Sequence, residues 1–187
     1  LRFGSWIGGD QDGNPNAGPA TLRAASARAR ELVLRRYADE VREMARTLGV
    51  SRTLVEVNEA LLTSIAADEQ RLAGQPGEIN ASADDEPYRR KLWLMHQRLL
   101  ATAEGQPGGY GHVHEFVADL EVIDASLRAH RGERIANGRL AALRRRVELF
   151  GFHVAKLDVR VHCRDLTGQT DRVRETLQVV ADLQRQH

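Results

Sequence analysis

The chain has 187 residues, of which 42% are hydrophobic and 28% are charged, and its formal net charge is +1. This composition is typical of a globular protein with a sizeable core, and the balanced charge argues against nucleic acid as a partner. No apolar run approaches the roughly 18 residues of a membrane-spanning helix, and no signal-peptide pattern is present, so we expect no membrane partner. The single cysteine, Cys163, excludes an internal disulfide and favours a reducing, cytoplasmic setting.

The first eighteen residues are predicted to form a shaped loop, because four glycines within ten positions disfavour a helix. The loop lacks the Gly-Lys-Ser/Thr ending of a phosphate-binding P-loop and the Gly-x-Gly-x-x-Gly spacing of a dinucleotide site. Asp10-x-Asp12-Gly13-Asn14 is superficially similar to a calcium loop. Its glycine comes two places early, however, and Thr21 stands where a bidentate Glu is needed, so calcium is disfavoured.

Apolar residues at helical spacing predict a series of helices from residue 19 to residue 150. The first has Leu22, Leu32, Val33 and Tyr37 among its apolar positions and ends at Gly49. The segment 53–57 could be extended or helical. Further helices are expected at 58–73 with Asn58 as its cap, at 85–104 with Asp84 or Asp85 as its cap, at 114–131 and at 138–150. Loops are expected at 74–85 and 105–111, the second too rich in glycine to hold one shape unaided.

Residues 154–162 are predicted to form the chain's best strand, because apolar and polar residues alternate there. Leu157, Val159 and Val161 would face one side, and Asp158, Arg160 and His162 would face the other. A final helix is expected at 169–187.

Two segments resemble a known family. Residues 3–15, FGSWIGGDQDGNP, are similar to the F-x-S-W-hydrophobic-G-G-D-R-D-G-N-P signature of phosphoenolpyruvate carboxylases. Residues 143–160, LRRRVELFGFHVAKLDVR, resemble the family's L-R-R-x-V-x-x-F-G stretch and the [LI]-D-[ILV]-R strand after it. Between them, EPYR at 86–89 and IANG at 135–138 are also similar to family landmarks. The chain is therefore identified as an internal fragment of a phosphoenolpyruvate carboxylase.

The resemblance implies a mainly α fold, with one or two strands that join the central β-barrel of the full-length enzyme. The expected organisation is a signature loop at 1–18, helices at 19–150, a strand at 154–162 and a helix at 169–187. The implied reaction joins phosphoenolpyruvate and bicarbonate to give oxaloacetate and phosphate, which feeds the tricarboxylic acid cycle. Mg²⁺ or Mn²⁺ would be the cofactor, with its ligands outside this fragment.

Family members are several times longer than this chain, and their other landmark motifs, including F-H-G-R-G-G-S, do not occur in it. The start at Leu1, directly against the signature loop, also indicates an excised piece. We therefore expect the fragment alone to be inactive. Its partners would be the two substrates, the remainder of the parent chain and, in the full-length parent, further copies forming a homo-oligomer (a tetramer), all in the cytoplasm.

The resemblance also assigns site residues. Arg160 matches the family's arginine that reaches the substrate phosphate, and a planar guanidinium fork suits phosphate oxygens. Without the motif, a structural arginine paired with Asp158 or Asp165 would be favoured. Trp6 matches a tryptophan that helps to form an apolar pocket for carbon dioxide, where water must be excluded; the alternative is a core tryptophan. A supporting role in the loop is expected of Asp10, Asp12, Asn14, Gly8, Gly9 and Gly13.

Two departures from the family pattern affect this expectation. Gln11 replaces the usual arginine of the signature, and Val161-His162-Cys163 replaces the usual Gln-Glu-Ser or Gln-His-Ser. The alternative function is a helical interaction or ligand-sensing module, derived from the carboxylase without its catalysis.

Other candidate sites are weaker. His112-x-His114 has the spacing of a metal pair but no obvious further ligands, so no metal ligand is assigned in this chain. His162 and Cys163 are neighbours that would point to opposite sides of a strand, which argues against a Cys-His nucleophile.

Overall fold

The computed structural model describes residues 4–12, 14, 16–49, 56–73, 85–163 and 170–185. Gly13, most of segment 53–57 and residues 74–84 of the predicted connection lie outside this range. The described chain is mainly helical, as the sequence predicted, with one short two-stranded parallel sheet. It divides into two compact units, Leu1–Val33 with Leu149–His187, and Leu34–Glu148.

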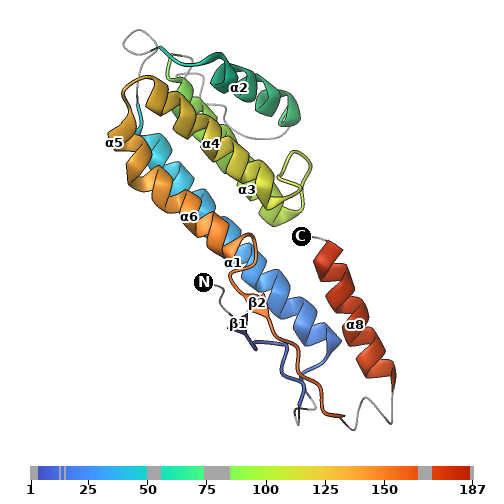
Figure 1. Cartoon of the computed structure of the whole chain (residues 1–187). Coiled ribbons are helices and arrows are strands. Elements are labelled where there is room, and N and C mark those ends of the chain that lie inside the picture. Colours follow the sequence, from blue (N-terminus) through green and yellow to red (C-terminus); the bar gives the residue numbers. More distant parts are fainter. Residues whose placement is uncertain are drawn as a thin grey trace. The chain divides into compact units, whose positions relative to one another are not determined.

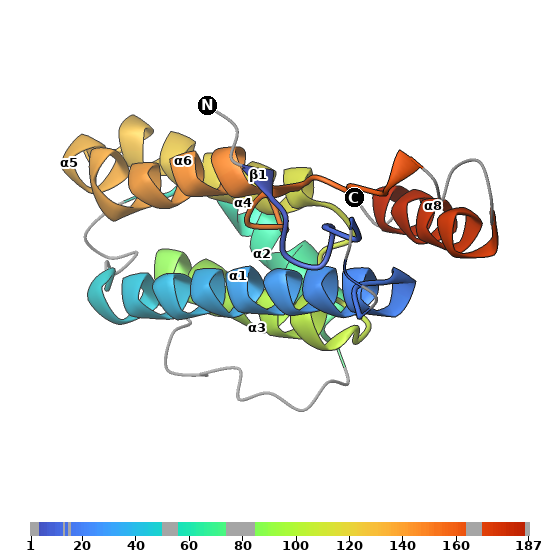
Figure 2. The same cartoon turned by 90° about the horizontal axis from the view of Figure 1, so that it is seen from below.

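The second unit is a group of packed helices (Figures 1 and 2). Its members are the C-terminal half of α1 (Pro19–Thr47), α2 (Glu59–Arg71), α3 (Pro87–Glu104), α4 (Val113–Ala129), the short α5 (Glu133–Ile135), the π-helix η2 (Ala136–Leu140) and α6 (Ala141–Phe150). Helix α2 contacts both α3 and α4, which also contact each other. The apolar positions predicted from helical periodicity in α3 and α4 are buried, among them Leu92, Met95, Leu99, Phe116, Leu120, Ile123 and Leu127.

Local signals account for several helix ends. Asn58 caps α2, as predicted, because its side-chain oxygen accepts from the backbone N–H of Leu61 at 3.0 Å. Helix α3 begins at Pro87, two residues later than the expected start at residue 85. Its N-cap is Glu86, not Asp84 or Asp85, since Pro87 takes the first helical position, where a missing N–H costs nothing. Helix α3 ends at Gly105 with a φ of 66°, a conformation that glycine adopts without strain.

The predicted helix at 138–150 is preceded by the π-helical segment η2, which the sequence did not indicate. Gly138, within it, has φ −87° and ψ −124°, values that do not belong to a helix, so the chain kinks at this glycine. Leu32 also departs from expectation. It fits the apolar spacing of α1 but its side chain is 60% exposed.

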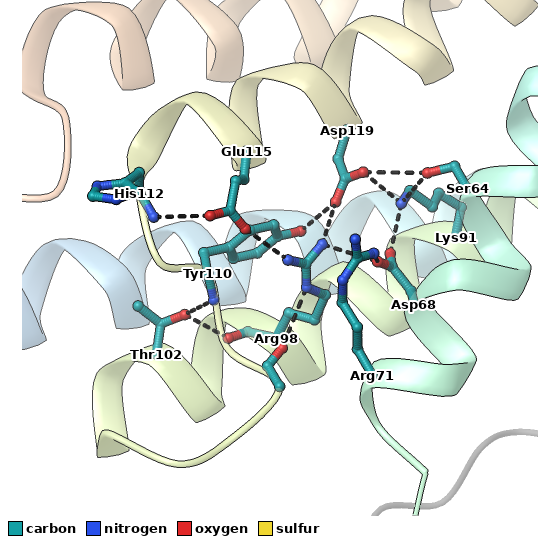
Figure 3. A network of polar contacts seen from close by, with 11 residues as sticks. Ser64, Asp68, Arg71, Lys91, Arg98, Thr102, Tyr110, His112, Glu115 and Asp119 are labelled. Carbon is teal, nitrogen blue, oxygen red and sulfur yellow. Dashed lines mark hydrogen bonds and ion pairs between the residues drawn. The ribbon is translucent and has the colours of Figure 1, made fainter.

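Three helices of the second unit meet around a fully buried lysine (Figure 3). The Lys91 ammonium, on α3, donates to Ser64 Oγ and Asp68 Oδ2 of α2 and to Asp119 Oδ1 of α4, each at 2.6 Å. An ammonium has three donors, and here all three have acceptors. The charge of Lys91 is therefore compensated although no part of the residue is exposed.

Arg98, about two helical turns further along the same face of α3, extends this network (Figure 3). Its guanidinium donates to Asp68 at 2.9 Å, to Asp119 at 3.0 Å and to Glu115 at 3.1 Å. It also lies over the ring of Tyr110, with Cζ 3.8 Å from the ring centroid. The network thus contains two cations of different shape. The compact ammonium of Lys91 lies among three acceptors, and the planar guanidinium of Arg98 spreads its N–H groups over separate carboxylates.

The same network holds the glycine-rich loop between α3 and α4. The Tyr110 hydroxyl donates to Asp119 at 2.8 Å, and the backbone N–H of Tyr110 donates to Thr102 Oγ1 at 2.6 Å. Arg98 Nε donates to the carbonyl of Gly108 at 3.3 Å. Burial, together with the charges of Asp119 and Asp68, raises the pKa of the Tyr110 phenol well above its usual value, so this hydroxyl remains a donor.

The first unit contains the N-terminal loop, the start of α1, strands β1 (Gly4–Ser5) and β2 (Lys156–Leu157), and helix α8 (Thr170–Arg185). The strand is shorter than the predicted 154–162, with one further bridge at Arg160. Val154, at its expected start, has a φ of 71°. A β-branched residue in this left-handed region cannot belong to a strand. None of the helices that the structure describes combines the length and apolarity needed to cross a membrane.

Candidate functional site

The N-terminal loop and the segment at 156–160 form one paired structure in the first unit. Strand β1 runs parallel to β2, with Gly4 opposite Lys156 and Ser5 opposite Leu157. Beyond the strands, the backbone N–H of Arg160 donates to the carbonyl of Gly9, and the N–H of Gln11 donates to the carbonyl of Arg160, both at 2.9 Å. The backbone of Arg160 is therefore fixed to the loop on both sides.

Two glycines allow the loop to approach its neighbours this closely. Gly8 has a φ of 77°, and a Cβ on it would lie 2.6 Å from the Cβ of Ala25 on α1. A Cβ on Gly9 would overlap the carbonyl oxygen of Asp158. The lack of space for a Cβ therefore explains the glycine at each position, whether or not the loop takes part in a reaction.

Replacing Gly9 with Ala should consequently destabilise the chain, by about 1–3 kcal/mol, because backbone and not a flexible side chain must move. Gly18→Ala is the matched control, since the nearest atom to its added Cβ would be Arg172 Nε at 4.0 Å. Chemical denaturation of both variants measures the difference. Equal stabilities for the two variants would show that the loop does not pack against Asp158 as described.

Arg160 and Trp6, the two residues that the sequence placed in the site, lie together. The Arg160 Cζ is 5.0 Å from the centroid of the Trp6 ring, within the range of a cation–π contact. Trp6 is 58% exposed in the described chain. Among the described residues no carboxylate pairs with Arg160, and in particular the neighbouring Asp158 does not. Asp165 lies outside the described range.

The polar residues of the loop have different surroundings. Asn14 Oδ1 accepts from the backbone N–H of Asn16 at 3.0 Å, so this side chain closes a turn of the loop. Asp12 is exposed. Asp10 has a buried oxygen, Oδ1, with no hydrogen-bond partner in the described part of the chain.

Helix α8 supports the loop through contacts that no sequence pattern indicated. Gln11, the departure from the family signature, is only 4% exposed, and its amide oxygen lies 3.2 Å from the hydroxyl of the buried Thr176. Arg172 donates to the carbonyls of Asn14 and Ala17. Burial of the neutral amide of Gln11 costs less desolvation free energy than burial of a charged guanidinium at the same position would. Helical spacing alone predicted α8, but not which of its residues face the loop.

An apolar cavity of about 560 Å³ lies beside the paired segment, within the first unit. Leu157 and Val159 line it, as does Leu32 of α1, whereas Arg160 does not. The predicted alternation of side chains therefore holds for residues 157–160, because the two apolar side chains face the cavity and the two charged ones do not. The most exposed large apolar side chains of the described chain also belong to this unit: Trp6, Ile7, Leu32 and Leu177.

The sequence argument about His162 and Cys163 is wrong. Their side chains do not diverge, because the chain is no longer a strand at these residues, and Cys163 Sγ lies 3.9 Å from His162 Nδ1. The distance is long for a hydrogen bond, and Cys163 is exposed. His112 and His114 stack with ring centroids 5.3 Å apart at the start of α4. No group of three or more His, Cys, Asp or Glu residues able to hold a metal occurs in the described ranges.

Comparison with known proteins defines the class to which this chain belongs. The sequence profile of the phosphoenolpyruvate carboxylase family matches residues 1–186. The chain is 42% identical over 198 residues to a phosphoenolpyruvate carboxylase of Nocardia farcinica, covering 98% of the chain and 19% of that relative. It is 39% identical over 174 residues to one of Nitrosomonas europaea, covering 87% of the chain and 18% of the relative. A Ralstonia nicotianae carboxylase is 39% identical over 172 residues, with 86% and 17% covered.

The chain therefore belongs to the phosphoenolpyruvate carboxylase family, as the two motifs indicated. It spans about a fifth of the length of the curated relatives that it matches.

Proposed function

We propose that this chain is the part of a phosphoenolpyruvate carboxylase that grips the phosphate of phosphoenolpyruvate. The full-length enzyme would carboxylate this substrate with bicarbonate to give oxaloacetate and phosphate. The observation that supports the proposal is the way in which Arg160 is held. Its backbone is fixed on both sides, yet its guanidinium has no carboxylate partner in the described structure and stays exposed.

A guanidinium on a fixed backbone, with no carboxylate partner among the described residues, is suited to a dianionic phosphate. Its planar donors can make two parallel charge-assisted hydrogen bonds to phosphate oxygens, which a flexible ammonium cannot. In this reaction the phosphoryl group would pass from phosphoenolpyruvate to bicarbonate, which leaves the enolate of pyruvate and carboxyphosphate, and carboxyphosphate would release carbon dioxide and phosphate. Trp6, beside Arg160, offers apolar surface for a pocket that would hold this carbon dioxide, and exclusion of water there would protect the enolate from protonation. The carboxylates of Asp10 and Asp12, with Asn14, would support the loop rather than react.

The full-length enzyme would use Mg²⁺ or Mn²⁺. The described residues do not fit such an ion, because no three His, Cys, Asp or Glu side chains among them are arranged so that they could hold a metal. We therefore infer that the metal ligands lie in the remainder of the parent chain.

The parent chain would also cover the apolar surface of the first unit. Ile7 is 77% exposed and Leu177 is 63% exposed, which is unusual for large aliphatic side chains in a complete domain. We also propose that the full-length protein forms a homo-oligomer in the cytoplasm.

The isolated 187-residue chain is expected to be catalytically silent, because the metal ligands lie elsewhere. Oxaloacetate formation from phosphoenolpyruvate, bicarbonate and Mg²⁺ measures this directly, with the full-length carboxylase carrying this chain as the positive control. Turnover by the isolated chain would refute the proposed division of the site. An inactive full-length protein would instead favour a ligand-sensing module derived from the carboxylase.

A further inference from the structure

The side chain of Arg160 needs lateral support if it is to hold a phosphate in one orientation. Hydrogen bonds to Gly9 and Gln11 fix its backbone, but these bonds leave the long side chain free to rotate. In the described structure no carboxylate orients the guanidinium. Ordering such a long side chain costs conformational entropy.

Trp6 is the residue placed to provide this support. Its own backbone is fixed, because its carbonyl accepts from the N–H groups of Gly9 and Asp10 at 2.9 and 3.1 Å. Its ring lies 5.0 Å from the Arg160 Cζ. The same short turn thus sets the position of the indole and, through Gly9, that of the arginine backbone.

We propose that Trp6 is a positioning residue for Arg160, in addition to any role as an apolar wall. This inference rests on the proposed function, since it assumes that Arg160 binds the substrate phosphate. A cation held by an aromatic ring keeps all its N–H groups for a ligand, whereas an arginine held by a carboxylate has given some of them away. The indole would therefore orient the guanidinium without competing with phosphate.

The two roles of Trp6 predict different kinetic consequences. A positioning residue affects the affinity for phosphoenolpyruvate and for inorganic phosphate as a competing ligand. An apolar wall affects what happens to the enolate, because water that enters the pocket protonates it and pyruvate is formed in place of oxaloacetate. Phosphate affinity and the fraction of pyruvate are therefore separate readouts.

The test compares Trp6→Phe and Trp6→Leu in the full-length carboxylase that carries this chain. Trp6→Phe keeps a weaker π face and should raise the KM for phosphoenolpyruvate and the inhibition constant of inorganic phosphate about 2- to 5-fold. Trp6→Leu keeps apolar bulk without a π face and should raise both by roughly 10-fold or more. Ile7→Ala is the control, since it removes exposed apolar surface next to Trp6 and should leave both constants unchanged.

A double-mutant cycle with Arg160→Ala separates this inference from the proposed function. If Trp6 acts through Arg160, Trp6→Leu should cause no further loss of phosphate affinity in the Arg160→Ala background. Phosphate affinity that survives Trp6→Leu but not Arg160→Ala would overturn the positioning role and leave the proposed function intact. Phosphate affinity that survives Arg160→Ala would overturn both.

Discussion

Replacing Lys91 with Met is expected to lower the free energy of unfolding by about 3–5 kcal/mol, the cost typical of breaking a buried ion pair from one side. The substitution keeps the length and apolar stem of the side chain but removes all three ammonium donors. Ser64, Asp68 and Asp119 would then lose the partner that each contacts at 2.6 Å. The two carboxylates would stay buried with one cation fewer to balance them.

Lys91→Arg provides a sharper test of the geometry. A guanidinium keeps the charge, but its planar donors cannot point at three oxygens arranged around one nitrogen, so we expect a substantial part of the loss to remain. Arg46→Ala is the surface control. Its exposed pair with Glu43 should contribute almost nothing. Denaturant unfolding monitored by circular dichroism compares the three variants, and parental stability in Lys91→Met would show that the network does not hold these helices together.

Replacing Arg160 with Lys in the full-length carboxylase is expected to lower kcat/KM by roughly 30- to 1000-fold, equivalent to about 2–4 kcal/mol of transition-state stabilisation. The charge is retained, but the planar fork that grips two phosphate oxygens is lost. The thermal midpoint should barely move, because the side chain is exposed and pairs with no described carboxylate.

Arg160→Ala distinguishes this expectation from a structural role. If the arginine bridged Asp158 or Asp165, its truncation would lower the melting temperature, and the remaining activity would follow the amount of folded protein. Steady-state kinetics and thermal denaturation on both variants resolve the two cases. Near-parental kcat/KM in Arg160→Lys would contradict the phosphate fork.

Helical periodicity was enough to predict the apolar core of the second unit but not its charged centre. Residues such as Leu99 and Phe116 recur at the spacing of a buried stripe. Lys91, Arg98 and Asp119 look like solvated surface in sequence, because burial of a charge depends on partners from other helices. Composition does not reveal the site either: only two of the 27 basic residues are lysines, and the count does not show that one of them, Lys91, is buried.

The motifs pointed to candidate site residues, but they did not predict how those residues are arranged in space. The two motifs named Trp6 and Arg160, but nothing in either motif showed that the loop pairs in parallel with residues 156–160. Parallel pairing joins segments distant in sequence, so local patterns do not report it. The contacts of Gln11 with Thr176 and of Asn14 with Arg172 depend on the same tertiary arrangement.

A crystal structure of the full-length carboxylase with a phosphoenolpyruvate analogue would show whether Arg160 binds the substrate phosphate. We expect guanidinium nitrogens at about 2.7–2.9 Å from two phosphate oxygens, with the Trp6 ring still against the guanidinium. A phosphate bound elsewhere, with Arg160 paired to Asp158 or Asp165, would contradict it.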